Sequence, residues 1–558
     1  MKVALIQSNP VTGALNANKQ SLIAAAIKAA ELGAELCVAP EMALCGPNAG
    51  DLLLRSDFLK DCREALDEMA EELANVPSMP PLVLGAPIAN LVPQGKSAQN
   101  CAVLIHEGNA AVIGRKVLVP SEGVHGEARY FEPGVSCGVL QHKGWRFAVT
   151  IGDDIWNDRN FWQERRSFTI DPVADFIAAG GADALINLTA LAFEQDLPEL
   201  HKKLLAHLSS HYRIPTVAAN LVGGNDSLVY YGGSAGFDAS GNLLALAPMF
   251  EESLLLVDIS GRKSGEIAPG MDADEELWRA ITLGTKDFVH KCGLSRVVLG
   301  LSGGVDSALV ACIAVDAFGS ENVSALLMPS PFSSQGSIDD SLALAKNLGI
   351  ATYTVPVTPM LEAYTSSYSK VFTEGLRGLA QENVQSRIRC DLLMAYANTF
   401  GALLLATGNK SEAAVGYSTL YGDLAGGYAP IGDIYKHQVY SLCRWFNREH
   451  DGAIPEEILT KAPSAELRPD QKDSDSLPDY PLLDPILYEI IEKRAGMERL
   501  VEKGFDPAVC HEVLRLVHKA EFKRHQAPPA LHLSRRSFGS GWNEPICNAY
   551  TTDPLGKH

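Results

Sequence analysis

A glycine turn in the second half of the chain constrains the fold more than any other feature. The run Leu-Ser-Gly-Gly-Val-Asp-Ser at 301–307 lies between an apolar, strand-like run at 296–301 and a helix-like run at 308–318, and a second strand-like run follows at 323–328. Strand, turn, helix and strand in this order open a doubly wound parallel sheet. The sequence therefore predicts an α/β fold with this turn at its first strand.

The turn has the composition of a phosphate-binding loop. Glycines let backbone N–H groups face an anion, and the N-terminus of the following helix adds partial positive charge. An isolated Gly-Gly pair would only make a tight turn, but six ordered positions after a strand favour a binding loop. The loop is not a Walker A loop, because it has no Gly-Lys-Ser/Thr ending. The candidate phosphate-binding residues are Gly300, Leu301, Ser302, Gly303, Gly304, Val305, Asp306 and Ser307.

The length of 558 residues favours at least two separately cored domains. Up to about residue 258, short apolar runs alternate with helical stretches such as 19–32, which indicates layered α and β structure. The segment 259–265 gathers Gly, Ser and charge as linkers do. We therefore predict domains at 1–262 and 268–558, and a loop or lid at 462–484, where Pro, Asp and Ser accumulate.

Composition excludes several classes of partner. The net charge of −20 disfavours binding to nucleic acid. The longest apolar runs are too short to span a bilayer, and the first run ends at Asn9-Pro10, too early for a signal peptide. The 11 Cys form no CxxC pair, which is typical of free thiols in a reducing compartment. These features predict a cytoplasmic enzyme that binds no membrane.

The glycine loop resembles the pyrophosphate loop of the N-type ATP pyrophosphatases, which include the NAD, GMP, asparagine and argininosuccinate synthetases. Four further strings resemble the NAD synthetases in particular, at 382–389, 407–412, 421–430 and 521–528. Each string alone could be a solvated helix face, a cap or a basic patch. Their order along residues 268–548 favours this family over another synthetase built on the same fold.

The resemblance implies a ligase that converts deamido-NAD to NAD⁺ with ATP and Mg²⁺. The substrate carboxylate would attack the α-phosphate, and ammonia would then displace AMP from the acyl-adenylate. Loop residues Ser302–Ser307 would hold pyrophosphate, and Asp306 with Glu412 would bind Mg²⁺. The resemblance further assigns Thr407 and Lys436 to ATP, and Asn383, Arg387, Glu412 and Lys523 to deamido-NAD. One departure is His437, where the family often has Thr.

The first domain resembles the carbon-nitrogen hydrolases, whose α-β-β-α sandwich carries a Glu, a Lys and a Cys. Glu41 closes an apolar strand as the family's general base does, and Lys116 lies in a matching Arg-Lys-Val-Leu-Val-Pro string. The nucleophile segment, however, reads Ile-Gly-Asp-Asp-Ile-Trp, so that Gly152 occupies the cysteine position. The resemblance therefore implies a catalytic triad at Glu41, Lys116 and Gly152 that has lost its nucleophile.

Glycine cannot carry a thioester, so we expect glutamine hydrolysis to be lost and nitrogen to come from ammonia. The string at 188–193 also departs from the family's glutamine-contacting segment, which favours natural decay over an engineered change. Three alternatives stay open for this domain. Cys45 could replace the nucleophile, Glu41 and Lys116 could form only a buried salt bridge, or the pocket could sense a metabolite. Membership of the NAD synthetase family would also imply a homo-oligomer.

Overall fold

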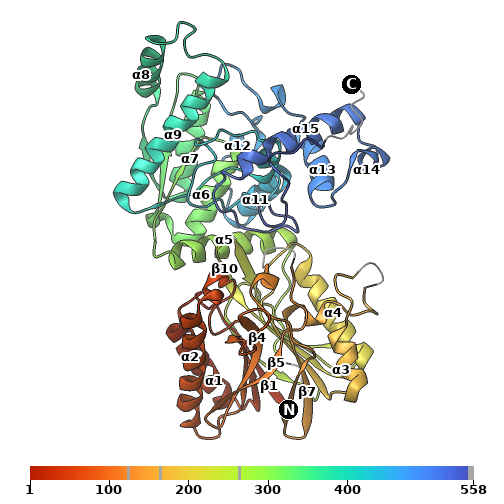
Figure 1. The fold of residues 1–558 in the computed structure, drawn as a ribbon. Coiled ribbons are helices and arrows are strands. Elements are labelled where there is room, and N and C mark those ends of the chain that lie inside the picture. The colour runs from red at the N-terminus through yellow and green to blue at the C-terminus, as the bar shows by residue number, and fades with distance from the viewer. Residues whose placement is uncertain (122–125, 163–165, 262–264, 551–558) are drawn as a thin grey trace. The chain divides into compact units, whose positions relative to one another are not determined.

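The computed structural model describes residues 1–121, 126–162, 166–261 and 265–550 and shows two compact α/β units (Figure 1). The first unit is Met1–Met271 and the second is Asp272–His558. The predicted domain end at residue 262 falls outside the described residues. Within those residues, no helix combines the length and apolar character that a membrane span requires.

The first unit contains two six-stranded sheets, ordered β14-β1-β2-β3-β4-β5 and β13-β12-β9-β8-β7-β6. The first sheet comprises β1 (Lys2–Gln7), β2 (Leu36–Val38), β3 (Leu82–Ala89), β4 (Ala98–His106), β5 (Asn109–Arg115) and β14 (Ser253–Asp258). The second comprises β6 (Gly138–His142), β7 (Trp145–Ile151), β8 (Ala184–Thr189), β9 (Thr216–Asn220), β12 (Ala235–Phe237) and β13 (Leu243–Leu246). A separate hairpin joins β10 (Val222–Asn225) to β11 (Leu228–Tyr231).

Apolar side chains from both sheets meet in one core, which includes Leu5, Val38, Val149 and Ile186. Each sheet buries its other face under a pair of helices, as the cores shared between helices and strands show. The helices are α1 (Leu15–Glu31) and α2 (Ser56–Ala74) on the first sheet, and α3 (Pro172–Gly180) and α4 (Leu197–Tyr212) on the second. The predicted α-β-β-α sandwich is therefore confirmed.

The second unit is built on a parallel sheet with the order β17-β16-β15-β18. The strands are β15 (Val297–Gly300), β16 (Val323–Leu327), β17 (Ala351–Thr354) and β18 (Leu403–Leu404). Helix α6 (Val305–Phe318) connects β15 to β16. The predicted order of strand, turn, helix and strand is confirmed, and the glycine turn lies at the carboxyl end of a central strand.

Helices pack against this sheet and form the C-terminal part of the unit as far as Arg524. They are α5 (Ala273–Lys291), α7 (Gln335–Leu348), α8 (Thr358–Ser369), α9 (Leu379–Phe400), α10 (Lys410–Val415), α11 (Lys436–Glu449), α12 (Glu456–Thr460), α13 (Tyr480–Ile491), α14 (Met497–Glu502) and α15 (Pro507–Arg524). The predicted loop at 462–484 is too long, because α13 begins at Tyr480. Pro481 lies in the first turn of that helix, where a missing N–H costs no hydrogen bond.

A buried lysine connects α10 to the C-terminal part of the second unit. The side chain of Lys410 is fully buried, and its Nζ lies 2.9 Å from Asp433 Oδ1 and 2.7 Å from Glu492 Oε1. The same nitrogen donates to the Arg536 carbonyl at 3.0 Å. Removing one partner of such a buried cluster leaves uncompensated charge in a poorly solvated place.

We expect the substitution Lys410→Met to destabilise the second unit by about 3–5 kcal/mol, because it leaves two buried carboxylates without their cation. Differential scanning calorimetry would detect the loss as a lower melting temperature. The matched control is Arg377→Met, which removes an exposed pair with Glu374 whose side chains are 72% and 78% exposed. Equal melting temperatures for the two variants would contradict the role of Lys410.

Candidate functional site

The glycine turn forms a compact loop between β15 and α6. Gly303 has φ +76°, and a Cβ there would lie 2.4 Å from the Ser337 carbonyl oxygen, so this position accepts only glycine. Ser302 Oγ accepts a hydrogen bond from the Gly304 N–H at 3.3 Å, and Ser307 Oγ donates to the Gly304 carbonyl at 3.0 Å. Within the residues that the structure describes, no side chain caps the N-terminus of α6. The loop therefore presents helix-end dipoles beside a serine-stabilised turn.

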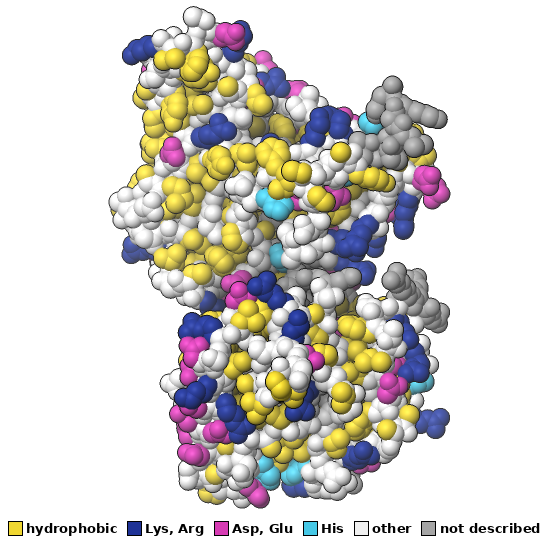
Figure 2. Space-filling model, in the orientation of Figure 1, with side chains coloured by type: hydrophobic (Ala, Val, Ile, Leu, Met, Phe, Trp, Pro, Cys, Tyr) yellow, Lys and Arg dark blue, Asp and Glu magenta, His cyan; other side chains and the backbone are white. Residues whose placement is uncertain are grey.

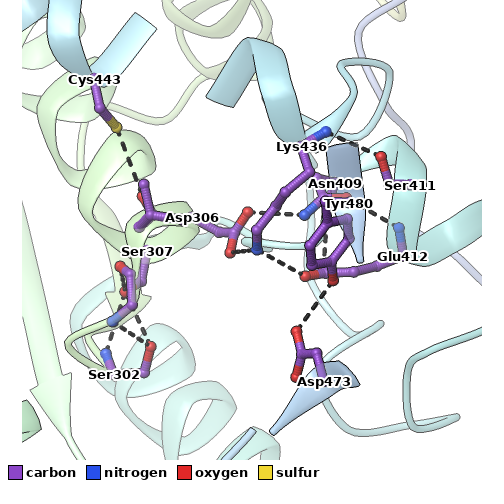
Figure 3. A network of polar contacts seen from close by, with 12 residues as sticks. Ser302, Asp306, Ser307, Asn409, Ser411, Glu412, Lys436, Cys443, Asp473 and Tyr480 are labelled. Carbon is purple, nitrogen blue, oxygen red and sulfur yellow. Dashed lines mark hydrogen bonds and ion pairs between the residues drawn. The ribbon is translucent and has the colours of Figure 1, made fainter. Parts of the chain in front are cut away.

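Asp306, Asn409, Glu412 and Lys436 form a polar network beside this loop (Figure 3). Lys436 Nζ lies 2.5 Å from Asp306 Oδ2 and 3.3 Å from Glu412 Oε1. Asn409 Nδ2 donates to Asp306 Oδ1 at 2.8 Å, and Asn409 also caps α10 through its contact with the Glu412 N–H. Helices α6, α10 and α11 thus each place one charged group at the same point.

Burial changes the titration of these groups. It raises the pKa of the Glu412 carboxyl to about 8, an effect that Lys436 opposes and Asp306 increases. Burial alone would lower the pKa of Lys436, but the carboxylates of Asp306 and Glu412 raise it above its ordinary value. The ammonium group of Lys436 therefore pairs with two carboxyl groups, so acidic side chains outnumber basic ones in this network.

A cavity of about 640 Å³ opens beside this network. It is lined by every residue that the sequence assigned to phosphate, ATP, metal or dinucleotide except Gly303 and Ser307. The volume lies within the range of pockets that bind nucleotides and other small molecules. The structure therefore brings residues from 300 to 523 into one site.

The candidate dinucleotide residues lie in the same cavity and are held by local hydrogen bonds. Thr419 Oγ1 donates to Asn383 Oδ1 at 3.0 Å, and Arg387 Nε donates to the Leu420 carbonyl at 3.1 Å. Lys523 Nζ donates at 2.7 Å to the carbonyls of Gly416 and Ser418. Burial lowers the pKa of Lys523. These side chains enter from α9 and α15, which lie far apart in sequence.

In the first unit, a further buried lysine lies among carboxylates. Lys116 is 1% exposed, and its Nζ lies 3.0 Å from Glu41 Oε1, 2.8 Å from Glu127 Oε2 and 2.9 Å from Asp153 Oδ2. Burial raises the pKa of Glu127 to about 8, although Lys116 opposes this shift. Asn100 Nδ2 donates to Glu41 Oε1 at 2.7 Å. The structure therefore brings Glu41 and Lys116 into direct contact.

Gly152 faces this cluster from the first residue after β7. Its φ is +49°, and an added Cβ would lie 2.6 Å from Glu41 Oε2 and 2.7 Å from Lys116 Nζ. The ends of these two flexible side chains occupy the space in front of the glycine. The three predicted residues therefore meet at one point, where Gly152 contributes only its backbone.

Cys45 is packed away from this cluster. It is fully buried in an apolar core with Met42, Phe58 and Cys62, and its Sγ donates to the Gly46 carbonyl at 3.2 Å. Burial raises the pKa of its thiol well above the ordinary value. Among the described residues, those that line the small cavity at Glu41 do not include Cys45. Its neighbourhood gives no support to Cys45 as a substitute nucleophile.

The sequence matches two family models, described as carbon-nitrogen hydrolase over residues 2–268 and as NAD synthase over residues 277–527. A glutamine-dependent NAD(+) synthetase of Synechocystis is 44% identical over 98% of this chain and 99% of the relative. One from Thermotoga maritima is 37% identical over 100% of both chains. The chain belongs to the NAD⁺ synthetase family. Its members are ligases, so the predicted enzyme class is confirmed.

Solved structures of NAD⁺ synthetases show the same architecture. The glutamine-dependent NAD+ synthetase of Acinetobacter baumannii in complex with ADP is 33% identical, covers 99% of both chains and has a TM-score of 0.76. A glutamine-dependent NAD(+) synthetase from Cytophaga hutchinsonii has the same fold, with a TM-score of 0.83 at 20% identity over 98% of both chains. The arrangement of an amidase-type unit and a synthetase unit in one chain is therefore that of this family.

Sequence reasoning missed two residues of the polar network in the second unit, Asp473 and Tyr480. Tyr480 Oη donates to Asp473 Oδ2 at 3.1 Å, and the Tyr480 ring centroid lies 5.1 Å from Lys436 Nζ (Figure 3). Both residues fall in the stretch that the sequence predicted as a loop or lid. Its irregular composition carries no periodicity that would have separated buried from exposed positions.

The raised pKa of Glu412 predicts a pH-dependent stability. A carboxyl that binds its proton more tightly in the folded state makes the folded protein less stable as pH rises from about 4.5 to about 8. Without metal or nucleotide, Glu412→Gln removes this loss. The melting temperature of the variant should therefore rise relative to that of the parent protein as pH increases through that window. Calorimetry at several pH values measures the difference. The control is Glu374→Gln at an exposed position, and a pH-independent difference for Glu412→Gln would contradict the assignment.

Proposed function

We propose that the protein makes NAD⁺ by ATP-dependent amidation of deamido-NAD, with ammonia as the nitrogen donor. Family membership supports the synthetase reaction. The observation that carries the choice of ammonia is Gly152, which offers no side-chain nucleophile at the point where Glu41 and Lys116 meet. The competing function is glutamine-dependent synthesis, because the similar proteins of Synechocystis and Thermotoga maritima are named glutamine-dependent.

In this proposal the glycine loop binds the phosphates of ATP. Its backbone N–H groups and the N-terminus of α6 would attract the pyrophosphate, and Lys436 would add positive charge to the same phosphates. Thr407 lines the same cavity and is proposed to contact ATP. Catalysis then rests on holding the substrate carboxylate in line with the α-phosphate and on stabilising the charge that develops there.

The acidic groups of the site fit Mg²⁺. Asp306 and Glu412 supply carboxylate oxygens, and Mg²⁺ in nucleotide sites is commonly held by one or two carboxylates together with substrate phosphates. Lys436 contacts both acids in the structure, and a bound divalent cation would favour the charged form of Glu412, whose pKa burial raises to about 8. Bound Mg²⁺ would screen the phosphate charge against the approaching carboxylate. We therefore propose Asp306 and Glu412 as the metal-binding residues.

The proposed deamido-NAD residues are Asn383, Arg387, Glu412 and Lys523. Arg387 and Lys523 are cations on the wall of the large cavity, and the two phosphates of a dinucleotide suit such donors. Asn383 contributes an amide that can bind a hydroxyl or a carboxamide. The 640 Å³ cavity gives room for nucleotide-sized ligands beside the glycine loop.

With Glu41 and Lys116 in their present positions, the pocket of the first unit has no room for the metabolite of the sensing alternative. The cavity at Glu41, Asn100 and Glu127 measures about 40 Å³, which admits a water-sized molecule. A glutamine side chain would need Glu41 and Lys116 to move. We therefore propose that these two residues are retained as a buried ion pair rather than as working amidase residues.

Exposed apolar side chains on α8, α9 and the segment between them support a homo-oligomer. They include Tyr364, Val371, Phe372, Leu379 and Phe400, each more than half exposed. Figure 2 shows apolar side chains over this part of the second unit. Large exposed apolar surface marks an interaction site. We propose a second copy of the chain as its partner, as expected from the family resemblance.

The proposal predicts NAD⁺ formation from deamido-NAD, ATP and Mg²⁺ with ammonium, and none above background with glutamine freed of ammonia. Chromatographic measurement of NAD⁺ and AMP tests both donors. Asp306→Asn serves as the control, because loss of a metal-binding carboxylate should abolish turnover with ammonium. Glutamine turnover equal to that with ammonium would overturn the choice of donor, and no turnover with either would overturn the synthetase reaction.

Restoring a thiol tests the proposed role of position 152. We expect Gly152→Cys to hydrolyse glutamine measurably, because the groups facing the new Cβ are the flexible ends of Glu41 and Lys116, which can move aside. The matched control is Gly152→Ala, which has the same backbone strain and no nucleophile. Glutamate release measures hydrolysis. Equal rates for the two variants would contradict the assignment of Gly152 to the nucleophile position.

A further inference from the structure

Lys436 has an aromatic neighbour besides its two carboxylates. It is the first residue of α11 and is 2% exposed, and its Nζ lies 5.1 Å from the centroid of the Tyr480 ring. A cation near the face of an aromatic ring is attracted by the ring's electron density, and the attraction grows when water is excluded. The Tyr480 ring therefore restricts the positions that the Lys436 ammonium group can occupy.

Asp473 controls the orientation of Tyr480. It is 6% exposed, and its Oδ2 accepts the Tyr480 hydroxyl hydrogen at 3.1 Å (Figure 3). The Asp473 backbone N–H donates to the Pro463 carbonyl at 3.1 Å, which fixes the carboxylate within the segment between α12 and α13. In the described chain no ion pair joins Asp473 directly to Lys436. Asp473 therefore acts on Lys436 by direct attraction between the two charges and, through its contact with the Tyr480 hydroxyl, by way of the tyrosine.

The start of α13 is itself fixed against α11. Asp484, four positions after Tyr480 on the same helix face, accepts from the His437 N–H at 2.8 Å and from the Ser411 hydroxyl at 2.6 Å. The His437 ring also contacts Asp484 Oδ2, at 2.9 Å through Nδ1. The unusual His437 thus strengthens the contact between the two helices. Because α13 cannot shift relative to α11, the hydroxyl contact with Asp473 decides how the Tyr480 ring lies.

We propose that Asp473 and Tyr480 are positioning residues for ATP binding. Asp473 orients the Tyr480 ring, and the ring holds Lys436 where its ammonium group meets the phosphates. The inference rests on the proposed contact between Lys436 and ATP. It gives a function to the irregular segment 461–479, whose residues Ser464, Glu466 and Asp473 line the same cavity as the glycine loop.

The test compares Asp473→Asn, Tyr480→Phe and Tyr480→Leu in the full chain with ammonium as nitrogen donor. Each variant should raise the KM for ATP about 3- to 10-fold, with Tyr480→Leu at the upper end because it removes the ring. The kcat at saturating ATP should stay within about 2-fold, as expected for lost ground-state binding. The matched control is Asp475→Asn, in the same short turn, where the side chain is 39% exposed and pairs with Arg468.

Three further results decide the inference. The double variant Asp473→Asn/Tyr480→Phe should have no larger effect than Asp473→Asn alone, because that variant already removes both the charge and the carboxylate that accepts from Tyr480. Additive effects, or a KM change for Asp475→Asn equal to that for Asp473→Asn, would overturn the proposal. So would a Tyr480→Leu enzyme whose KM for ATP stays within about 2-fold of the parent value at an unchanged melting temperature. Lys436→Met tests separately the proposed contact between Lys436 and ATP, on which the inference rests. If this variant binds ATP as the parent protein does, that contact fails.

Discussion

The candidate site of the second unit depends on one buried ammonium group shared by two carboxylates. Lys436 lies between Asp306 and Glu412, and these three residues lie in the first turns of three separate helices. Removing an ion from water costs several kcal/mol, so each of these buried groups needs its partners in contact with it for the fold to be stable. The Asn409 cap, the Asp484 contacts and the Tyr480 ring each fix one of the helices that deliver them.

The same physical arrangement occurs in the first unit with a different outcome. Lys116 is surrounded by Glu41, Glu127 and Asp153; the lysine and Glu41 are nearly closed to solvent, whereas Asp153 is 38% exposed. In the second unit the buried charges border a 640 Å³ cavity, whereas in the first they border about 40 Å³. Under the proposed function, the first cluster maintains the sandwich and the second does the chemistry.

The glycine loop was the most predictable part of the site, because its constraint is local. Gly303 needs positive φ and has no room for a Cβ, and both requirements are visible as a glycine between a strand and a helix. Asp473 and Tyr480 were not predictable in this way. Their importance comes from contacts with Lys436 and with each other across the fold, and the Pro-rich and Asp-rich composition around them concealed the start of α13.

The sequence by itself determined the two α/β units, the position of the glycine loop and the identity of the charged residues, because strand and helix periodicity and turn chemistry are written in neighbouring residues. It also showed that position 152 has no side chain. Only the tertiary structure decided that Glu41 and Lys116 fill the space in front of Gly152, and that Cys45 points into an apolar core. Those facts depend on which side chains meet after distant strands pair, and local patterns do not encode such distances.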